Sequence, residues 1–469
     1  MGSFHSEDVE SKLKSPFESY LPPSSPLCPS FLKKQAKLVA EAASIPLGHE
    51  LGRQHFLLDP SWTFINHGAF GAASRVGFSE ATQWREHCER QPLRFFDRDL
   101  LPHLAHSCYT MARFIGAAPT DVALLPNATT GLNTVMRGVL EEECATTTGT
   151  GTRRSSSSAP RRIFMFDTAY GAVKKIASDI AARNLNVVVD VAPLPLPLSH
   201  LTAKEARDVI VDVANEYMHP DTSLAVFDHT TSNTALNMPL AALAGVARDR
   251  GAKVLIDGAH GLLAQSSVDG FASDDALDIA TLSNAGVDFY VANCHKWFAS
   301  PKAAALLWSR SGECQQQCRP LVVSHGLGQG FFSSLAWDGC RDYSSALSLP
   351  RTVDLWKSIG IRRTRSYMDA LSGTALEILQ KSWGERDGGR TLAPFELHGP
   401  MTLVSLPSSS SDWTDTDAKA VQDALHHDHM VECPIKCIRG QLYARISVHV
   451  YNEASDYEIL ASAVQKIMR

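Results

Sequence analysis

Short apolar runs alternate with amphipathic stretches along most of the chain after residue 62. The runs that predict strands are 122–125, 163–166, 187–191, 224–227, 254–256, 289–292 and 303–308. Between them, apolar positions three and four residues apart predict helices over 129–140, 171–183, 203–217 and 240–250. Uninterrupted apolar strands separated by helices are typical of a parallel sheet that is covered on both faces. The pattern therefore predicts an α/β fold for this part of the chain.

The pattern changes after residue 352, where a long helical stretch begins. It is followed by a strand at 401–406, a helix at 418–426, a strand at 442–450 and a helix at 455–468. This order predicts a small α+β unit. We therefore predict a mobile N-terminal arm (1–55) with one helix at 31–43, a large domain (56–355) and a small C-terminal domain (356–469). Within the large domain, the Thr-, Gly- and Ser-rich stretch 146–160 is predicted to be a disordered surface insertion.

The composition is that of an ordinary globular protein, with 44% hydrophobic and 20% charged residues. A net charge of −6 argues against a broad nucleic-acid-binding surface. No apolar run is long enough to span a membrane, and the first thirty residues lack a secretory pattern. The ten cysteines show none of the usual zinc spacings, so we expect reduced thiols and no metal site. These features predict a cytoplasmic location.

Lys296 carries the strongest chemical signal in the sequence, because it closely follows the apolar run 289–292. A buried lysine is rare, and one with a depressed pKa is a good nucleophile towards carbonyls. Asp257 ends the run 254–256, and His260 follows three residues later. A lysine for the aldehyde and an aspartate for the pyridinium nitrogen are the protein groups that pyridoxal phosphate (PLP) requires. His260 is placed to reach the ring hydroxyl or the phosphate, although a lone histidine is more often structural.

Further polar groups follow other predicted strands, where open α/β sheets bind their ligands. Asn127 and Thr129 open a helix that suits a phosphate, or they are ordinary N-caps. Tyr170 either stacks on a planar ring or packs at a helix start, and the polar run 228–234 suits a ligand or a plain turn. Arg445 suits a substrate carboxylate or a surface salt bridge. No Gly-x-Gly-x-x-Gly occurs, which disfavours a nucleotide-dependent α/β enzyme.

Seven segments together carry a resemblance to a known family: 64–68, 126–131, 228–234, 257–260, 293–297, 337–342 and 445–452. From about residue 56 onward, the chain resembles fold-type I PLP enzymes of the class V aminotransferase group. Within it, the chain is most similar to isopenicillin N epimerase-like proteins, which include fungal hercynylcysteine sulfoxide lyases and the loline-pathway PLP enzyme. The resemblance implies a large domain with a mainly parallel sheet between helices, and a small C-terminal α+β domain.

The resemblance also implies roles for individual residues. Lys296 would bind the PLP aldehyde as a Schiff base and then move the α-proton of the substrate. The other implied cofactor-binding residues are Asp257 at the pyridine nitrogen, Tyr170 on the ring, Ala128, Thr129 and His295 near the phosphate, and Asn233 or His260 near the ring hydroxyl. The implied substrate-binding residues are Arg445 at the carboxylate, with Asn66 and His67 lining the substrate side. Such enzymes are usually homodimers with active sites at the subunit interface.

Two departures from the family pattern bear on the chemistry. Cys340 replaces the threonine of a Gly-Thr-Arg-Asp motif that reaches the partner's phosphate in relatives, and a thiol is the weaker hydrogen-bonding group. Sulfoxide lyases carry a cysteine in a stretch that corresponds to 186–193, where this chain has none. Cys294 is the nearest alternative, but strand geometry predicts that it points away from the lysine. The second departure disfavours sulfur transfer and sulfoxide lysis.

We therefore predict an enzyme that forms an α-carbanion from an amino acid. Ring-forming carbon–carbon bond formation or epimerisation in fungal-type specialised metabolism is the first expectation, by analogy alone. A carbon–sulfur lyase or desulfurase-like β-elimination is the alternative, and transamination is less favoured. A non-catalytic PLP-fold binding protein is the alternative of another class. The joint presence of Lys296, Asp257 and Arg445 argues against it.

Overall fold

The computed structural model describes residues 7–141, 160–183, 186–264, 276–384, 388–408, 410 and 412–468. The predicted insertion at 146–160 lies outside the described residues, except for Pro160. Among the described residues, no helix combines the length and the apolar character needed to cross a membrane.

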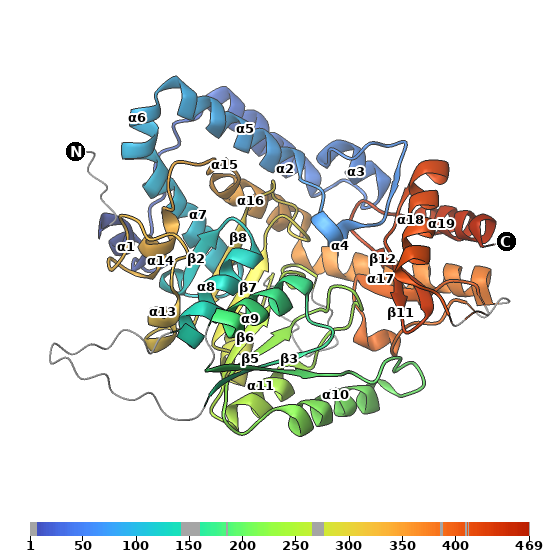
Figure 1. Ribbon diagram of the computed structural model, residues 1–469. Coiled ribbons are helices and arrows are strands. Elements are labelled where there is room, and N and C mark those ends of the chain that lie inside the picture. The colour runs from blue at the N-terminus through green and yellow to red at the C-terminus, as the bar shows by residue number, and fades with distance from the viewer. Residues whose placement is uncertain are drawn as a thin grey trace.

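A seven-stranded mixed sheet forms the centre of the molecule (Figure 1). Its order is β2 (Val122–Leu125), β8 (Ala305–Ser309), β7 (Phe289–Asn293), β6 (Lys253–Asp257), β5 (Thr222–Asp228), β3 (Arg161–Phe166) and β4 (Val187–Ala192). The strands from β7 to β4 are parallel, whereas β8 is antiparallel to both of its neighbours. The predicted α/β class with a mainly parallel sheet is confirmed, and all seven strands lie within two residues of their predicted limits.

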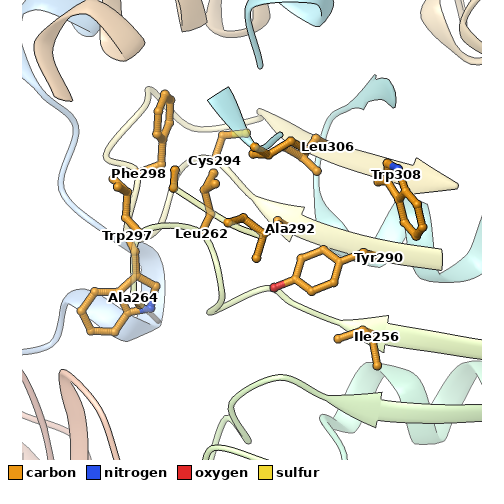
Figure 2. Close-up of a cluster of buried hydrophobic side chains, with 14 of the residues drawn as sticks. Ile256, Leu262, Ala264, Tyr290, Ala292, Cys294, Trp297, Phe298, Leu306 and Trp308 are labelled. Atoms are coloured by element: carbon orange, nitrogen blue, oxygen red, sulfur yellow. The ribbon is translucent and has the colours of Figure 1, made fainter. Parts of the chain in front are cut away.

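Both faces of this sheet are buried except at the edge strand β4, which explains why the inner strands are continuous apolar runs. Ala225 and Phe227 of β5 belong to one apolar cluster, whereas Leu224 and Val226 belong to the cluster on the opposite face. Figure 2 shows part of the first cluster, where Tyr290 and neighbouring side chains pack together. The helices that follow the strands are α8 (Ala128–Glu141), α9 (Gly171–Arg183), α10 (Ala203–Tyr217), α11 (Leu240–Arg248) and α12 (Ile279–Ala285).

Further helices connect and cover these elements. They are α4 (His67–Phe70), α5 (Arg75–Arg90), α6 (Pro92–Arg94), α7 (Leu100–Phe114), α13 (Glu313–Gln317), α14 (Phe331–Ala336), α15 (Ser344–Leu347) and α16 (Leu349–Ile359). A π-helical turn spans Phe95–Asp99, and 3₁₀ turns span Pro119–Asp121 and Phe395–Leu397. The long helix α7 contributes eleven buried side chains beneath the sheet, and α16 packs against it.

The C-terminal elements gather on one side of the sheet, in orange and red (Figure 1). They are α17 (Ile361–Trp383), β9 (Met401–Ser405), α18 (Asp415–His429), β10 (Val431–Glu432), β11 (Ile435–Ile438), β12 (Gln441–Ser447) and α19 (Ala454–Ile467). An antiparallel sheet of order β11-β12-β9 and a separate apolar cluster hold them together. The short strand β1 (Thr63–Phe64) pairs with β10, so an early segment joins this group. The exact domain limits stay a prediction.

Residues 7–55 pack on the rest of the chain, so the expected mobility is wrong for them, whereas the helix predicted at 31–43 is confirmed by α2 (Pro29–Ala42). This segment forms α1 (Glu7–Leu13), α2 and α3 (His49–His55). Val9, Leu13 and Leu51 are buried in the main apolar cluster. The hydroxyl of Ser358 also donates to the carbonyl of Val39 at 2.6 Å. Packing buries apolar surface of this segment that would be exposed to water in a free arm. The resulting hydrophobic free energy holds the segment on the large domain.

Candidate active site

A pocket of about 150 Å³ opens beyond the carboxyl ends of the parallel strands. Seven predicted site residues line it: Ala128, Thr129, Tyr170, Asp257, His260, His295 and Lys296. Asn66, His67, Asn233, Cys340 and Arg445 are not among its lining residues. Among the described residues, no group of three His, Cys, Asp or Glu side chains is placed to hold a metal ion.

Lys296 lies in the turn that follows β7, and its ε-amine reaches the pocket. Its Nζ is 3.1 Å from Nε2 of His260. Burial is the main cause that lowers the pKa of Lys296 to about 8; the charge of Arg445 acts in the same direction, whereas Asp257 and Asp228 oppose the shift. About a tenth of the amine is therefore neutral at pH 7, far more than for an ordinary lysine, and the neutral amine is the form that attacks an aldehyde.

Asp228 and Asp257 are register partners at the ends of neighbouring strands, and both line the pocket. Burial raises the pKa of both carboxyl groups, and the proximity of Asp257 raises that of Asp228 further. Asp257 accepts a hydrogen bond from the backbone N–H of Ala259 at 3.1 Å. A buried carboxylate at this position is stabilised by a cationic N–H, such as a protonated pyridine ring. Asp228 was not among the predicted site residues, although its position directly after the apolar run 224–227 is the signal that could have identified it.

The first turn of α8 faces the pocket; of the two roles that the sequence left open, the N-cap is observed and the phosphate site stays a prediction. The side chain of Asn127 caps the helix, since its Oδ1 accepts from the backbone N–H of Thr130 at 2.9 Å. Asn293, which the sequence analysis missed, accepts from the N–H of Ala128 at 2.9 Å. The N–H of Thr129 has no acceptor among the described residues. This free amide and the helix dipole suit a phosphate group.

His295 stands beside the lysine and also reaches the pocket. Its Nδ1 is 3.1 Å from the carbonyl oxygen of Ala304, so Nδ1 donates and Nε2 is left for a ligand. Burial lowers the pKa of His295 to about 4, which keeps the ring neutral.

His67 holds the backbone of the turn that carries Lys296 rather than lining the pocket. Its Nε2 donates to the carbonyl of Lys296 at 2.9 Å, and its Nδ1 accepts from the hydroxyl of Tyr451 at 2.6 Å. The ring is fully buried and stacks on His449 at 3.8 Å, and His449 donates to the carbonyl of Trp297 at 3.1 Å. Burial lowers the pKa of both histidines, so both are neutral. No ring nitrogen of His67 is left for a substrate.

Arg445 is buried beside the pocket with an incomplete set of partners. Its Nη1 donates to the carbonyl of Ser232 at 2.5 Å, and its Nη2 lies 3.5 Å from Oδ1 of Asn66. Its Nε has no partner among the described residues. Burial lowers the pKa of the guanidinium to about 10, which leaves it charged. A buried guanidinium with an unpaired N–H suits a carboxylate ligand. Asn233 is exposed, whereas its neighbour Ser232 lines the pocket.

Two predicted residues lie at the edge of the site or away from it. Tyr170 precedes α9, lines the pocket and is 45% exposed, so its ring is only partly covered by the chain. Cys340 is exposed, and its predicted contact is with a partner subunit, so it stays a prediction. None of the described lining residues is a cysteine. Cys294 packs in the apolar cluster beside Leu306 (Figure 2), and burial raises the pKa of its thiol.

Comparisons with known proteins agree with this geometry. No family model matches the chain. The chain is 33% identical over 426 residues to "Putative L-cysteine desulfhydrase 1" of Oryza sativa, which covers 86% of this chain and 83% of that protein. It is 27% identical to isopenicillin N epimerase of Amycolatopsis lactamdurans, over 89% of this chain and 98% of that protein. Hercynylcysteine sulfoxide lyase of Schizosaccharomyces pombe is 21% identical over 89% of this chain and 97% of its own length.

Solved structures show the same fold. A C-DES mutant with glycine covalently linked to its PLP cofactor matches with a TM-score of 0.66 at 18% identity, over 86% of this chain and 96% of that one. The pocket supplies the groups that PLP needs, namely an amine, a buried carboxylate and a free helix N-terminus. The chain therefore belongs to the PLP-dependent enzymes of fold type I and class V, the family of the cysteine desulfhydrases and isopenicillin N epimerases.

Proposed function

We propose that this enzyme is a carbon–sulfur lyase that acts on cysteine or a cysteine conjugate. The proposal rests on one observation: the poised amine of Lys296 reaches a pocket whose described lining residues include no cysteine. A base can remove the α-proton, but sulfur transfer also needs a cysteine thiol that accepts the sulfur atom. A pocket with the base and without that thiol therefore favours elimination. The similarity to a plant protein named as a cysteine desulfhydrase supports the same chemistry.

Each residue of the site has a proposed part in this reaction. Bound PLP supplies the electron-withdrawing ring that makes the α-proton of an amino acid acidic. Asp257 holds the ring nitrogen in its protonated form, and the first turn of α8 binds the phosphate. Arg445 holds the substrate carboxylate through its free N–H. Lys296 takes the α-proton, because about half of its amine is in the neutral, proton-accepting form near pH 8.

Elimination needs fewer protein groups than the competing reactions. A sulfur substituent leaves as a thiolate, which is stable near neutral pH without a separate general acid. For cysteine, the balanced outcome is that cysteine and water give pyruvate, ammonia and hydrogen sulfide. Sulfur transfer would require a cysteine nucleophile at the pocket, whereas Cys294 is buried in the apolar cluster.

Epimerisation and ring closure in specialised metabolism remain finer alternatives within the same proposal. Both begin with the same removal of the α-proton by Lys296. They differ from elimination in the fate of the substrate, since no β-substituent is lost. The similarity to isopenicillin N epimerase supports epimerisation as the second candidate.

The test is incubation of the PLP-loaded enzyme in deuterated water with L-cysteine, S-alkylcysteines and amino acids that lack a β-leaving group. Sulfide or thiol release with a matching amount of pyruvate would support the lyase. Deuterium at Cα with the opposite enantiomer would support an epimerase, and a cyclic isomer of unchanged composition from an amino acid that bears an aldehyde acceptor would support ring closure. Lys296→Ala is the control, and sulfide release that survives it would contradict the assigned base.

Two further expectations accompany the proposal. We propose a homodimer, supported by a run of exposed apolar side chains, Leu321, Val322, Val323 and Leu327, which are 47–68% exposed in the single chain. Light scattering that gives the mass of one chain at micromolar concentration would contradict it. A cytoplasmic location also stays a prediction, and one relative from Arabidopsis thaliana is named as chloroplastic.

A further inference from the structure

His260 is enclosed between a tryptophan and the pocket lysine. It is 3% exposed, and its two ring nitrogens face different residues. The indole Nε1 of Trp297 lies 3.3 Å from Nδ1, and Nζ of Lys296 lies 3.1 Å from Nε2. Figure 2 shows Trp297 beyond the end of the strand that carries Ala292, with its indole directed away from Phe298. Three residues thus form a chain from the apolar cluster to the site.

The chemistry of the indole decides the tautomer of His260. An indole N–H donates and cannot accept, so Nδ1 of His260 must be unprotonated to receive it. A neutral imidazole carries one proton, which then sits on Nε2 and points at Lys296. Burial and the nearby lysine both lower the pKa of His260, so the ring is neutral.

The protonation of Lys296 depends on what faces it. A neutral amine has a lone pair that accepts the Nε2–H of His260, whereas an ammonium group has only N–H donors. The opposite tautomer of His260 would present a lone pair and would favour the ammonium instead. We propose that Trp297 is a positioning residue, whose indole N–H fixes the proton of His260 on Nε2 and thereby favours the neutral form of the Lys296 amine.

Other charged groups act on the same amine and are unaffected by the indole. Asp257 and Asp228 favour the charged form, and Arg445 opposes it. His67, which is itself neutral, touches the lysine only through its backbone carbonyl. The inference rests on Lys296 being the amine of the proposed function, but it concerns the free side chain and can be measured without turnover.

The experiment measures the pKa of Lys296 in the cofactor-free protein. Trace labelling with acetic anhydride over pH 6–11, followed by peptide mass spectrometry, gives the reactivity of this one amine as a function of pH. We expect Trp297→Phe to raise the pKa of Lys296 by about one unit, because His260 becomes free to accept from the ammonium. At pH 7 this corresponds to about a tenfold slower labelling.

Two comparisons separate this effect from a general loss of packing. Trp356→Phe removes another buried indole, which donates to the carbonyl of Phe298 at 2.6 Å and does not contact His260. It should leave the pKa of Lys296 unchanged. In a His260→Leu background, Trp297→Phe should give no further change, since the residue through which it acts is gone. Trp297→Leu, which also lacks a donor, replaces the Phe variant if that variant does not fold.

An unchanged or lower pKa of Lys296 in Trp297→Phe would overturn the inference. So would an equal rise in Trp356→Phe, or a rise that persists without His260. Failure of the proposed function has a separate signature, because it shows as absent sulfide and pyruvate from the wild-type enzyme. The labelling result does not depend on that assay.

Discussion

Gly71 permits a close approach to the catalytic turn, and Gly71→Ala should therefore destabilise the protein and displace Lys296. Its φ is +69°, which favours glycine. A Cβ at this position would lie 2.2 Å from the carbonyl oxygen of His295 and 2.8 Å from Cα of Lys296. Both obstacles are backbone atoms, so a side-chain rotation does not relieve the contact.

The expected magnitude has two parts. A left-handed backbone costs an alanine about 1–2 kcal/mol relative to glycine. Overpacking against the turn costs about 1–3 kcal/mol more, which gives a total of about 2–5 kcal/mol. In a chain of this length, each kcal/mol lowers the thermal midpoint by about 1 °C, because the unfolding entropy scales with size. Movement of the amine by about 1 Å would also reduce the turnover number about 100-fold.

Two glycines provide matched controls. Gly251 has the same φ of +69° but no atom within 4 Å of its Cβ position, so Gly251→Ala should show only the backbone part. Gly373 lies within α17 and also has open space, so Gly373→Ala should stabilise the helix by up to about 1 kcal/mol. Thermal scans of the three PLP-loaded variants at one scan rate test this. A Gly71→Ala midpoint no lower than that of Gly251→Ala would refute the close-contact argument.

Three other predictions concern the titrating and binding groups of the pocket. Lys296→Ala should abolish the visible absorbance of the covalently bound cofactor and reduce turnover by about 10²- to 10⁴-fold; spectra that match the wild type would disprove the lysine assignment. The pKa of Lys296 is about 8 when folded and 10.5 ordinarily, so the unfolded chain binds more protons between these values and stability rises with pH across that window. Cofactor-free Lys296→Met should therefore be more stable than the wild type at pH 7, with a gap that narrows by pH 10 in thermal scans; a constant gap would contradict the shift. Arg445→Lys should lower kcat/KM for amino acids by about 10- to 100-fold but spare the corresponding amides, and equal losses for both would exclude carboxylate recognition.

Much of the fold was predictable because the signals are local. Six uninterrupted apolar runs, and a seventh (187–191) that contains Asp190, became the seven strands of the main sheet, since strands buried on both faces must be apolar throughout and only the edge strand β4 is partly exposed. The helix limits of α9 and α10 agree with their amphipathic periods. The N-terminal arm could not be predicted this way, because its few apolar residues gain stability only from a distant surface, such as α7 or α16.

The candidate site also has features that are local in sequence and features that depend on distant contacts. Sequence alone determined that Lys296 and Asp257 follow core strands, because strand ends can be read from the chain. The tertiary structure alone decided that Asp228 stands beside Asp257, since this depends on β5 pairing with β6. It likewise decided that His67 binds the hydroxyl of Tyr451, 384 residues away. The apolar period of a segment indicates which of its positions are buried and which face solvent. Contacts between distant side chains are fixed only when strand order and packing bring them together.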